Sequence, residues 1–294
     1  LFIRAMNDSL QANHITSVMG IINGTTNYIL SRMAREGAAY ADVLADAQKL
    51  GLAEPDPTAD VEGYDAAYKL SILSTLAFHR HVPVEKVYRE GITAITPLDV
   101  QCGREFGLTL KLLAVAKEEN GRIQARVHPT FVPNTHPLAS VNDAFNAAWV
   151  KGDMSDYTMY YGRGAGRAPT ASTVVGDIGD IARNLAHGET RYARGIPDYA
   201  QGQMKLRAAG EISSSYYLRF NVADKPGAFG VIATTLGAHG VSISAASQKA
   251  AGTDGFAPVV VLTHEAKTAD LMKALDEIVR SGMISGLPVS LRVL

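Results

Sequence analysis

The hydrophobic positions near the start of the chain fall into one strand-like run and two helical patterns. The β-branched run Ile15 to Ile22 predicts a buried strand, and the Gly-containing turn Asn23 to Asn27 follows it. Apolar positions at helical spacing then predict a helix from Tyr28 to about Arg35. A second helix is predicted from Tyr40 to Leu50, because Gly51 suits its C-terminal cap.

A longer helix is predicted beyond the segment Glu54 to Pro57, which must be extended because residues before proline avoid the α region. Asp60 suits the N-cap of this helix, which runs to about His79. Its apolar positions between Ala66 and Ala77 lie on more than one face and indicate a buried helix. From Ala94 to about Tyr161, strand-like segments alternate with turns and predict an antiparallel or mixed sheet.

The pattern changes towards the C-terminus. A cluster of glycines, Gly162 to Gly166, precedes a predicted helix from Ala171 to about Leu185. Residues 187–213 contain several glycines with little periodicity and predict an interdomain linker. Beyond it, the order strand, helix, strand, strand, helix, strand is a βαββαβ unit of the ferredoxin-like type. We therefore predict an α+β protein, with a mixed-sheet domain at residues 1–186 and a βαββαβ domain at residues 214–294.

Composition limits the classes of function. The 294 residues are 47% hydrophobic, which suits two folded domains. The 28 Lys and Arg residues nearly balance the 29 Asp and Glu residues, so the formal net charge is -1. Proteins that bind nucleic acids or anionic membranes usually carry an excess of positive charge, which this sequence lacks. No apolar run reaches the ~18 residues of a membrane span, and the lone Cys102 cannot form an internal disulfide, which favours the cytoplasm. The His79-Arg80-His81 cluster lacks further ligands at metal-site spacing, so no metal is expected.

The strongest local signal for chemistry lies between Gly51 and Lys69, a stretch rich in carboxylates. Asp65 and Lys69 are four residues apart and share a helix face, so the carboxylate can hold the ammonium, or both can point at one ligand. An ordinary surface ion pair explains the same spacing. The flanking residues are mostly apolar, and desolvation of the ammonium there would favour proton transfer.

Two Gly-containing turns are weaker candidates. The turn Asn23 to Asn27 places free N–H groups at a helix N-terminus, where a carboxylate or phosphate is favoured. Helix capping by Thr25, Thr26 or Asn27 is the simpler explanation. The turn Gly162 to Gly166 is only loosely similar to a dinucleotide-binding fingerprint, because its Gly spacing differs and no βαβ unit surrounds it.

Three long segments together resemble homoserine dehydrogenase. They are GIINGTTNYIL (Gly20 to Leu30), AQKLGLAEPDPTADVEGYDAAYKLSIL (Ala47 to Leu73) and GRGAGRAPTASTVVGDIGDIAR (Gly162 to Arg183), in the order of that family. The DKPG turn (Asp224 to Gly227) and the VSISAASQ strand (Val241 to Gln248) resemble an ACT domain. The resemblance covers essentially the whole chain. It implies an NAD(P)-dependent oxidoreductase that interconverts L-homoserine and L-aspartate 4-semialdehyde in threonine, methionine and isoleucine biosynthesis, with amino-acid feedback through the ACT domain.

The resemblance also implies roles for single residues on the substrate side. Lys69 resembles the catalytic lysine that relays the proton of the substrate hydroxyl. Asp65 and Glu54 resemble the carboxylates that hold the amino group and hydroxyl of homoserine, and Gly24 and Thr25 resemble the turn that lines the substrate site. These parts agree chemically, since oxidising an alcohol needs a hydride acceptor and a base within hydrogen-bond reach of the hydroxyl.

On the cofactor side, Gly164 and Gly166 fall in a turn that approaches the nicotinamide cofactor, NADP or NAD, in such enzymes. The family begins with a Rossmann domain bearing G-x-G-x-x-G, a motif that this sequence does not contain. We expect the corresponding residues to lie upstream of Leu1, and the chain alone to be inactive or severely weakened. The residue that selects NAD or NADP is expected there as well.

The ACT resemblance implies an effector site at the first strand-to-helix turn, where Asp224 and Gly227 lie, with threonine as the expected effector. A plain turn in a domain that serves dimerisation through its sheet explains the same residues. A homo-oligomer is expected in either case. The alternative for the whole chain is a catalytically inactive amino-acid-binding regulatory and dimerisation fragment.

Overall fold

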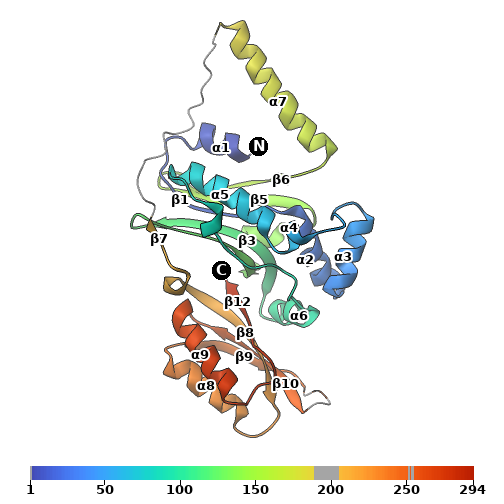
Figure 1. The fold of residues 1–294 in the computed structure, drawn as a ribbon, viewed down its shortest axis with the longest axis vertical. Coiled ribbons are helices and arrows are strands. Elements are labelled where there is room, and N and C mark those ends of the chain that lie inside the picture. The colour runs from blue at the N-terminus through green and yellow to red at the C-terminus, as the bar shows by residue number, and fades with distance from the viewer. Residues whose placement is uncertain (1, 189–204, 251, 253–254) are drawn as a thin grey trace. The chain divides into compact units, whose positions relative to one another are not determined.

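The structure is a computed structural model that describes residues 2–188, 205–250, 252 and 255–294 (Figure 1). The chain divides into two compact units. The first unit comprises Leu1–Ala94, Leu112–His128 and Ser140–Leu206, and the second comprises Ile95–Lys111, Pro129–Ala139 and Arg207–Leu294. Most of the linker predicted at 187–213 falls on residues 189–204, outside the described residues.

The first unit is built on antiparallel strands in the order β6–β5–β1–β3. Its elements are α1 (Phe2–Ser9), β1 (Ile15–Ile21), α2 (Gly24–Glu36), α3 (Tyr40–Lys49), α4 (Thr58–Val61), α5 (Tyr64–Phe78), β2 (Tyr88–Arg89), β5 (Phe145–Gly152), β6 (Asp156–Arg163) and α7 (Arg167–Ala186). Strands β3 (Leu108–Glu119) and β4 (Arg122–Pro133) contribute residues to both units. The predicted strand at Ile15 is confirmed, and its residues are almost all buried because strands pair with it on both sides.

Helix α2 begins earlier than the sequence pattern predicts. It starts at Gly24 rather than Tyr28, because the side chain of Asn23 accepts a 2.9 Å hydrogen bond from the backbone N–H of Thr26 and caps the helix. The prediction that Thr25, Thr26 or Asn27 caps this helix is therefore wrong. The Gly-Thr-Thr sequence forms the first turn of α2, directly after β1.

The helix predicted from Asp60 to His79 is two helices. Gly63 has a φ of 77°, a left-handed conformation that glycine adopts without strain, and it separates α4 from α5. Asp60 lies inside α4 and is not an N-cap. The break places Asp60 on α4 and Asp65 on α5, on either side of Gly63. Both residues belong to the candidate site.

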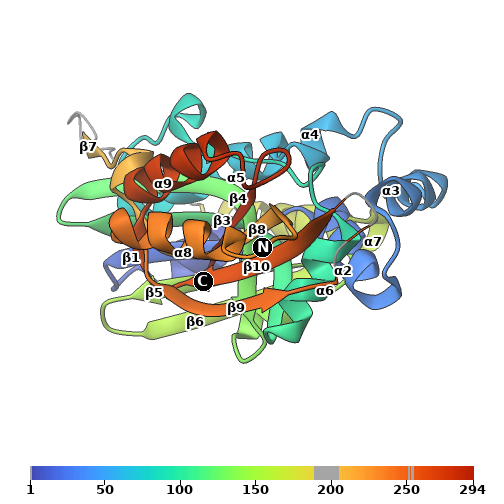
Figure 2. The same ribbon diagram turned by 90° about the horizontal axis from the view of Figure 1, so that it is seen from below.

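The second unit contains the predicted βαββαβ order, which is confirmed. Its elements are α6 (Pro97–Glu105), β8 (Ser213–Ala223), α8 (Ala228–Ala238), β9 (Ile243–Gln248), β10 (Phe256–Thr263), β11 (Ala266–Lys267), α9 (Thr268–Arg280) and β12 (Val289–Val293). Strands β12, β8, β10 and β9 pair in that order, each antiparallel to the next. Helices α8 and α9 lie side by side on one face of this sheet (Figure 2). Apolar side chains between helices and strands form the core, among them Leu218, Phe220, Ile232, Leu236, Val261, Leu271 and Ile278.

Helix α6 was not expected, since the sequence pattern between Ala94 and Tyr161 predicts strands and turns. The helix follows from its cap: Thr96 and Asp99 form a reciprocal capping box, and Pro97 occupies the first helical position. Cys102 on this helix is fully buried, and burial raises the pKa of its thiol. The thiol is therefore held in its unreactive protonated form.

Within the described residues, no helix combines the length and hydrophobicity needed to cross a membrane.

Candidate active site and effector site

The predicted ion pair of Asp65 and Lys69 is present on the first turns of α5. The Lys69 Nζ donates a 2.6 Å hydrogen bond to Asp65 Oδ2 and a 3.2 Å hydrogen bond to the carbonyl oxygen of Ile22. The Ile22 carbonyl follows the end of β1, so the ammonium is held between a helix and a strand end. The side chain of Lys69 is 48% exposed, so the apolar, desolvated environment expected from its flanks is wrong. Solvent and small molecules can reach the ammonium.

Asn23 connects this pair to a second carboxylate. Its Nδ2 donates hydrogen bonds of 2.7 Å to Asp60 Oδ1 and 3.0 Å to Asp65 Oδ2, while its Oδ1 caps α2. The sequence pattern predicts Asp60 as a helix N-cap and as one carboxylate of the acidic stretch, but it gives no sign of the contact with Asn23. Its place in the cluster depends on the break at Gly63, for which the sequence signal is the glycine itself.

Gly24 and Thr25 lie beside this cluster, at the N-terminus of α2. The Thr25 hydroxyl donates a 2.9 Å hydrogen bond to the carbonyl of Leu52, which ties the segment that carries Glu54 to the start of α2. The amide of Gln48 also holds this segment, by donating to the carbonyls of Glu54 and Pro55. The Glu54 side chain is exposed, and among the described residues it hydrogen-bonds to neither Asp65 nor Lys69.

The glycines predicted for the cofactor side follow strand β6. Gly164 and Gly166 are exposed, and Gly166 has a φ of 117° immediately before α7. A Cβ at Gly164 would collide with the side-chain amide of Asn146 on β5, so any larger residue at this position must displace that amide. A Cβ at Gly24 would lie 3.5 Å from Oδ1 of the same Asn146. The Asn146 side chain, which no sequence motif singles out, therefore lies against both the predicted substrate turn and the predicted cofactor turn.

In the part of the chain that the structure describes, no group of three or more His, Cys, Asp or Glu side chains is arranged to hold a metal ion.

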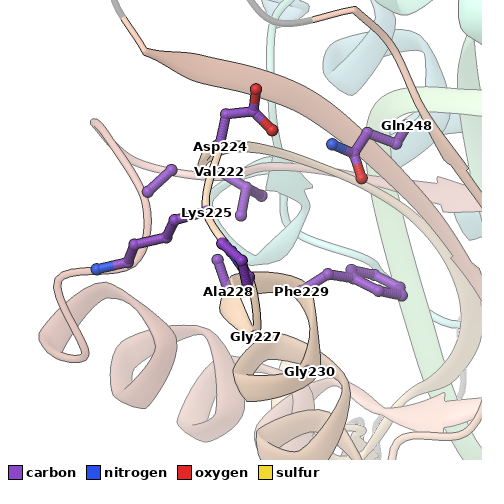
Figure 3. A pocket seen from close by; sticks show the side chains of 10 residues that line it. Val222, Asp224, Lys225, Gly227, Ala228, Phe229, Gly230 and Gln248 are labelled. Atoms are coloured by element: carbon purple, nitrogen blue, oxygen red, sulfur yellow. The ribbon is translucent and has the colours of Figure 1, made fainter.

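The residues predicted for effector binding line a pocket in the second unit (Figure 3). The cavity has a volume of about 410 Å³ and is lined by Val222, Ala223, Asp224, Lys225, Pro226, Gly227, Ala228, Phe229, Gly230 and Gln248. The side chains of Asp224 and Gln248 point toward one another across it, while Lys225 points away (Figure 3). Gly227 has a φ of 85° and precedes the first residue of α8, so its left-handed backbone shapes the turn under the cavity.

Comparisons with known proteins agree with both halves of this description. Residues 2–178 match the family model described as homoserine dehydrogenase, and residues 216–280 match the ACT domain model. The chain is 44% identical over 300 residues to homoserine dehydrogenase of Mycobacterium bovis, covering 99% of this chain and 67% of the relative. It is 45% identical over 273 residues to the Corynebacterium glutamicum enzyme, covering 91% of this chain and 60% of that relative. The chain thus spans about two thirds of the length of such relatives.

Solved structures give the same result. A homoserine dehydrogenase from Thiobacillus denitrificans superposes with a TM-score of 0.92 at 38% identity, covering 100% of this chain and 67% of that one. A hyperthermophilic archaeal homoserine dehydrogenase in complex with NADPH has a TM-score of 0.50 at 28% identity, covering 60% of this chain and 50% of that one.

The fold and the two matched regions define an α+β oxidoreductase with an ACT domain in its C-terminal part. More narrowly, the chain belongs to the homoserine dehydrogenase family. The resemblance found in the three sequence segments is therefore confirmed.

Proposed function

We propose that this chain carries the substrate site and the regulatory site of an enzyme that interconverts L-homoserine and L-aspartate 4-semialdehyde with NADP or NAD. The observation that supports it most is the cluster in which Asn23 joins Asp60 to the Asp65–Lys69 pair. Two carboxylates against one ammonium leave one negative charge unbalanced, which suits the ammonium group of an amino-acid substrate. The N–H groups at the start of α2 suit its carboxylate.

In this proposal Lys69 moves the proton of the reaction. During oxidation Lys69 accepts the proton of the substrate hydroxyl, and during reduction it donates a proton to the carbonyl oxygen. Asp65 and the Ile22 carbonyl hold Nζ in position for both directions. Glu54, on the segment tied to Thr25, and Asp65 would hold the amino and hydroxyl groups of the substrate.

The turn after β6 fits the nicotinamide cofactor. Gly164 and Gly166 present backbone without side chains on an exposed turn, which allows a flat ring to approach closely. The bound cofactor accepts or supplies the hydride. The archaeal relative solved with NADPH makes NADPH a suitable first probe for this chain.

In the second unit we assign Asp224 and Gly227 to the effector site, with threonine as the ligand. The Asp224 carboxylate would hold the ammonium of the amino acid, and the turn at Gly227 admits close approach of its backbone. We place the catalytic domain at residues 1–186 and the regulatory domain at residues 214–294. Threonine binding would then give feedback within threonine, methionine and isoleucine biosynthesis, and we propose that the protein acts in the cytoplasm.

We also propose that the chain forms a homo-oligomer, and an aromatic surface on β5 and β6 supports this. Phe145 stacks on Tyr161 at 5.0 Å between ring centroids, and Trp149 stacks on Tyr157 at 5.1 Å. The side chains of Tyr157 and Tyr161 are 47% and 56% exposed, and β6 is an edge strand in the first unit. A second copy of the chain would bury this surface.

Calorimetric titration of the chain with homoserine, threonine and NADPH in parallel tests the proposed function. We expect homoserine to bind at the cluster and threonine to bind in the cavity. The variant Asp60→Asn should weaken homoserine binding by roughly 10–100-fold, because it removes the unbalanced negative charge of the cluster, and leave threonine binding unchanged. The variant Asp224→Asn should do the opposite.

The two variants serve as controls for each other, since each alters one carboxylate in a different unit. If homoserine binds to neither the chain nor its variants, the substrate assignment is wrong. If threonine binds equally to the chain and to Asp224→Asn, the effector assignment is wrong. Threonine binding without any homoserine binding would favour the regulatory and dimerisation fragment instead.

A further inference from the structure

Asn146 has an unusual environment on β5. Its Oδ1 is buried and has no hydrogen-bond partner among the described residues. Its neighbours on the same strand have apolar side chains, and Ala147 and Ala148 are fully buried. An unpaired buried acceptor is unfavourable in a folded protein, so such an atom calls for a donor that the described residues do not supply.

The position of this amide relates it to the two glycine turns. Its Oδ1 faces Gly24, whose Cβ, if present, would lie 3.5 Å away, and its Nδ2 faces Gly164, where a Cβ would collide with it. The register explains this placement, because Asn146 pairs with Gly162 across β5 and β6, just before the turn at Gly164. The neighbouring strand β1 ends at the same level, since Ile21 pairs with Ala147.

The same register brings the amide near the candidate catalytic cluster. Ile22, whose carbonyl accepts the hydrogen bond from Lys69 Nζ, directly follows Ile21 at this end of the sheet. Gly24 is the first residue of α2, which Asn23 caps. Asn146 therefore lies at the strand ends where both the proposed substrate turn and the proposed cofactor turn begin.

We propose that Asn146 is a ligand-binding residue whose Oδ1 accepts a hydrogen bond from an N–H donor of the bound ligand. The inference rests on the proposed function, which offers two sources of such a donor: the ammonium of the substrate and the carboxamide of the nicotinamide. Gly24 lies against the amide oxygen and Gly164, which is exposed, lies against the amide nitrogen, so a ligand at this amide meets glycine backbone rather than side chains on both sides.

Two substitutions of nearly the same shape separate binding from packing. Asn146→Asp keeps an acceptor oxygen, and Asn146→Leu removes it. We expect Asn146→Leu to weaken binding of the donor-bearing ligand by about tenfold or more, and Asn146→Asp to stay within about threefold of the unchanged chain. Calorimetric titration measures both dissociation constants, and thermal unfolding of each variant shows whether it is folded.

Ligands that lack the N–H donor identify its source. If the substrate ammonium is the donor, Asn146→Leu weakens binding of homoserine but not of 4-hydroxybutyrate. If the nicotinamide carboxamide is the donor, Asn146→Leu weakens binding of NADP+ but not of nicotinic acid adenine dinucleotide phosphate. A matched control is Asn134→Leu, which alters an exposed asparagine that accepts a hydrogen bond from Thr109. This control should change none of these affinities.

A double-mutant cycle checks the contact with the cofactor turn. Gly164→Ala alone should weaken binding, because its methyl group displaces the Asn146 amide. In an Asn146→Ala background, the same methyl group finds room, and Gly164→Ala should weaken binding no further.

The possible failures are distinguishable. If the unchanged chain binds neither homoserine nor a nicotinamide cofactor, the proposed function fails. If it binds them and Asn146→Leu binds them equally well, only the role of Asn146 is refuted, and the amide acts as a spacer between the two turns.

Discussion

Replacing Lys69 by alanine is expected to lower kcat for homoserine oxidation by roughly 10²–10⁴-fold, the usual contribution of a positioned acid or base. The reason is geometric: Asp65 and the Ile22 carbonyl hold Nζ in place, while 48% of the side chain stays open to a ligand. Steady-state kinetics of active enzyme containing this chain measures the change. KM should change less than kcat, since the proton moves only in the transition state.

The matched control is Lys49→Ala. Lys49 forms an exposed ion pair with Asp46 at 3.5 Å, also within a helix, and it lies outside the cluster. Its removal should leave kcat within about twofold of the unchanged enzyme, because exposed ion pairs contribute little. Near-normal turnover of Lys69→Ala would remove the proton-transfer role from Lys69.

The largest effect on stability is expected from Arg219→Met in the second unit. Asp99 is completely buried, and Arg219 donates hydrogen bonds of 2.6 Å and 3.1 Å to its two carboxylate oxygens. Tyr217 and Thr96 donate to the same carboxylate, but neither carries a positive charge. Removing Arg219 leaves an uncompensated buried carboxylate, which typically costs about 3–5 kcal/mol.

Urea denaturation measures this loss as a change in the free energy of unfolding. The control is Lys249→Ala, which removes an ion pair with Glu105 on the same helix α6, where the Glu105 side chain is 41% exposed. That variant should lose less than about 1 kcal/mol. A loss of similar size in both variants would contradict the prediction that the buried Asp99–Arg219 pair stabilises the fold more than the Lys249–Glu105 pair does.

Local sequence signals predicted most of the secondary structure. The strand at Ile15, the helix at Tyr40 and the βαββαβ order are recovered, because hydrophobic periodicity and glycine caps act within a few residues. The errors at α2 and Asp60 came from choosing among several capping residues, whose competition depends on the surrounding structure. Helix α6 was missed although Thr96, Pro97 and Asp99 carry a capping signal.

The candidate site was predicted only in part. The Asp65–Lys69 pair follows from helical spacing alone, and the structure contains it. Asp60 and Asn146 could not be found in this way, because their partners are distant in sequence: Asp60 is 37 residues from Asn23, and Asn146 lies beside Gly24 and Gly164. No spacing rule connects such positions.

By itself, the sequence of this protein determined the family, the order of the elements and the ion pair at Lys69, since each depends on neighbouring residues. Tertiary structure alone decided which side chains share a site. The break at Gly63 sets Asp60 beside Asn23, and the register of β5 against β6 sets the Asn146 amide against Gly164. It also decided that residues 95–111 and 129–139 belong to the same compact unit as the ACT domain. The physical reason is that packing and strand register join residues far apart in the chain, whereas periodicity and capping report only on residues a few positions away.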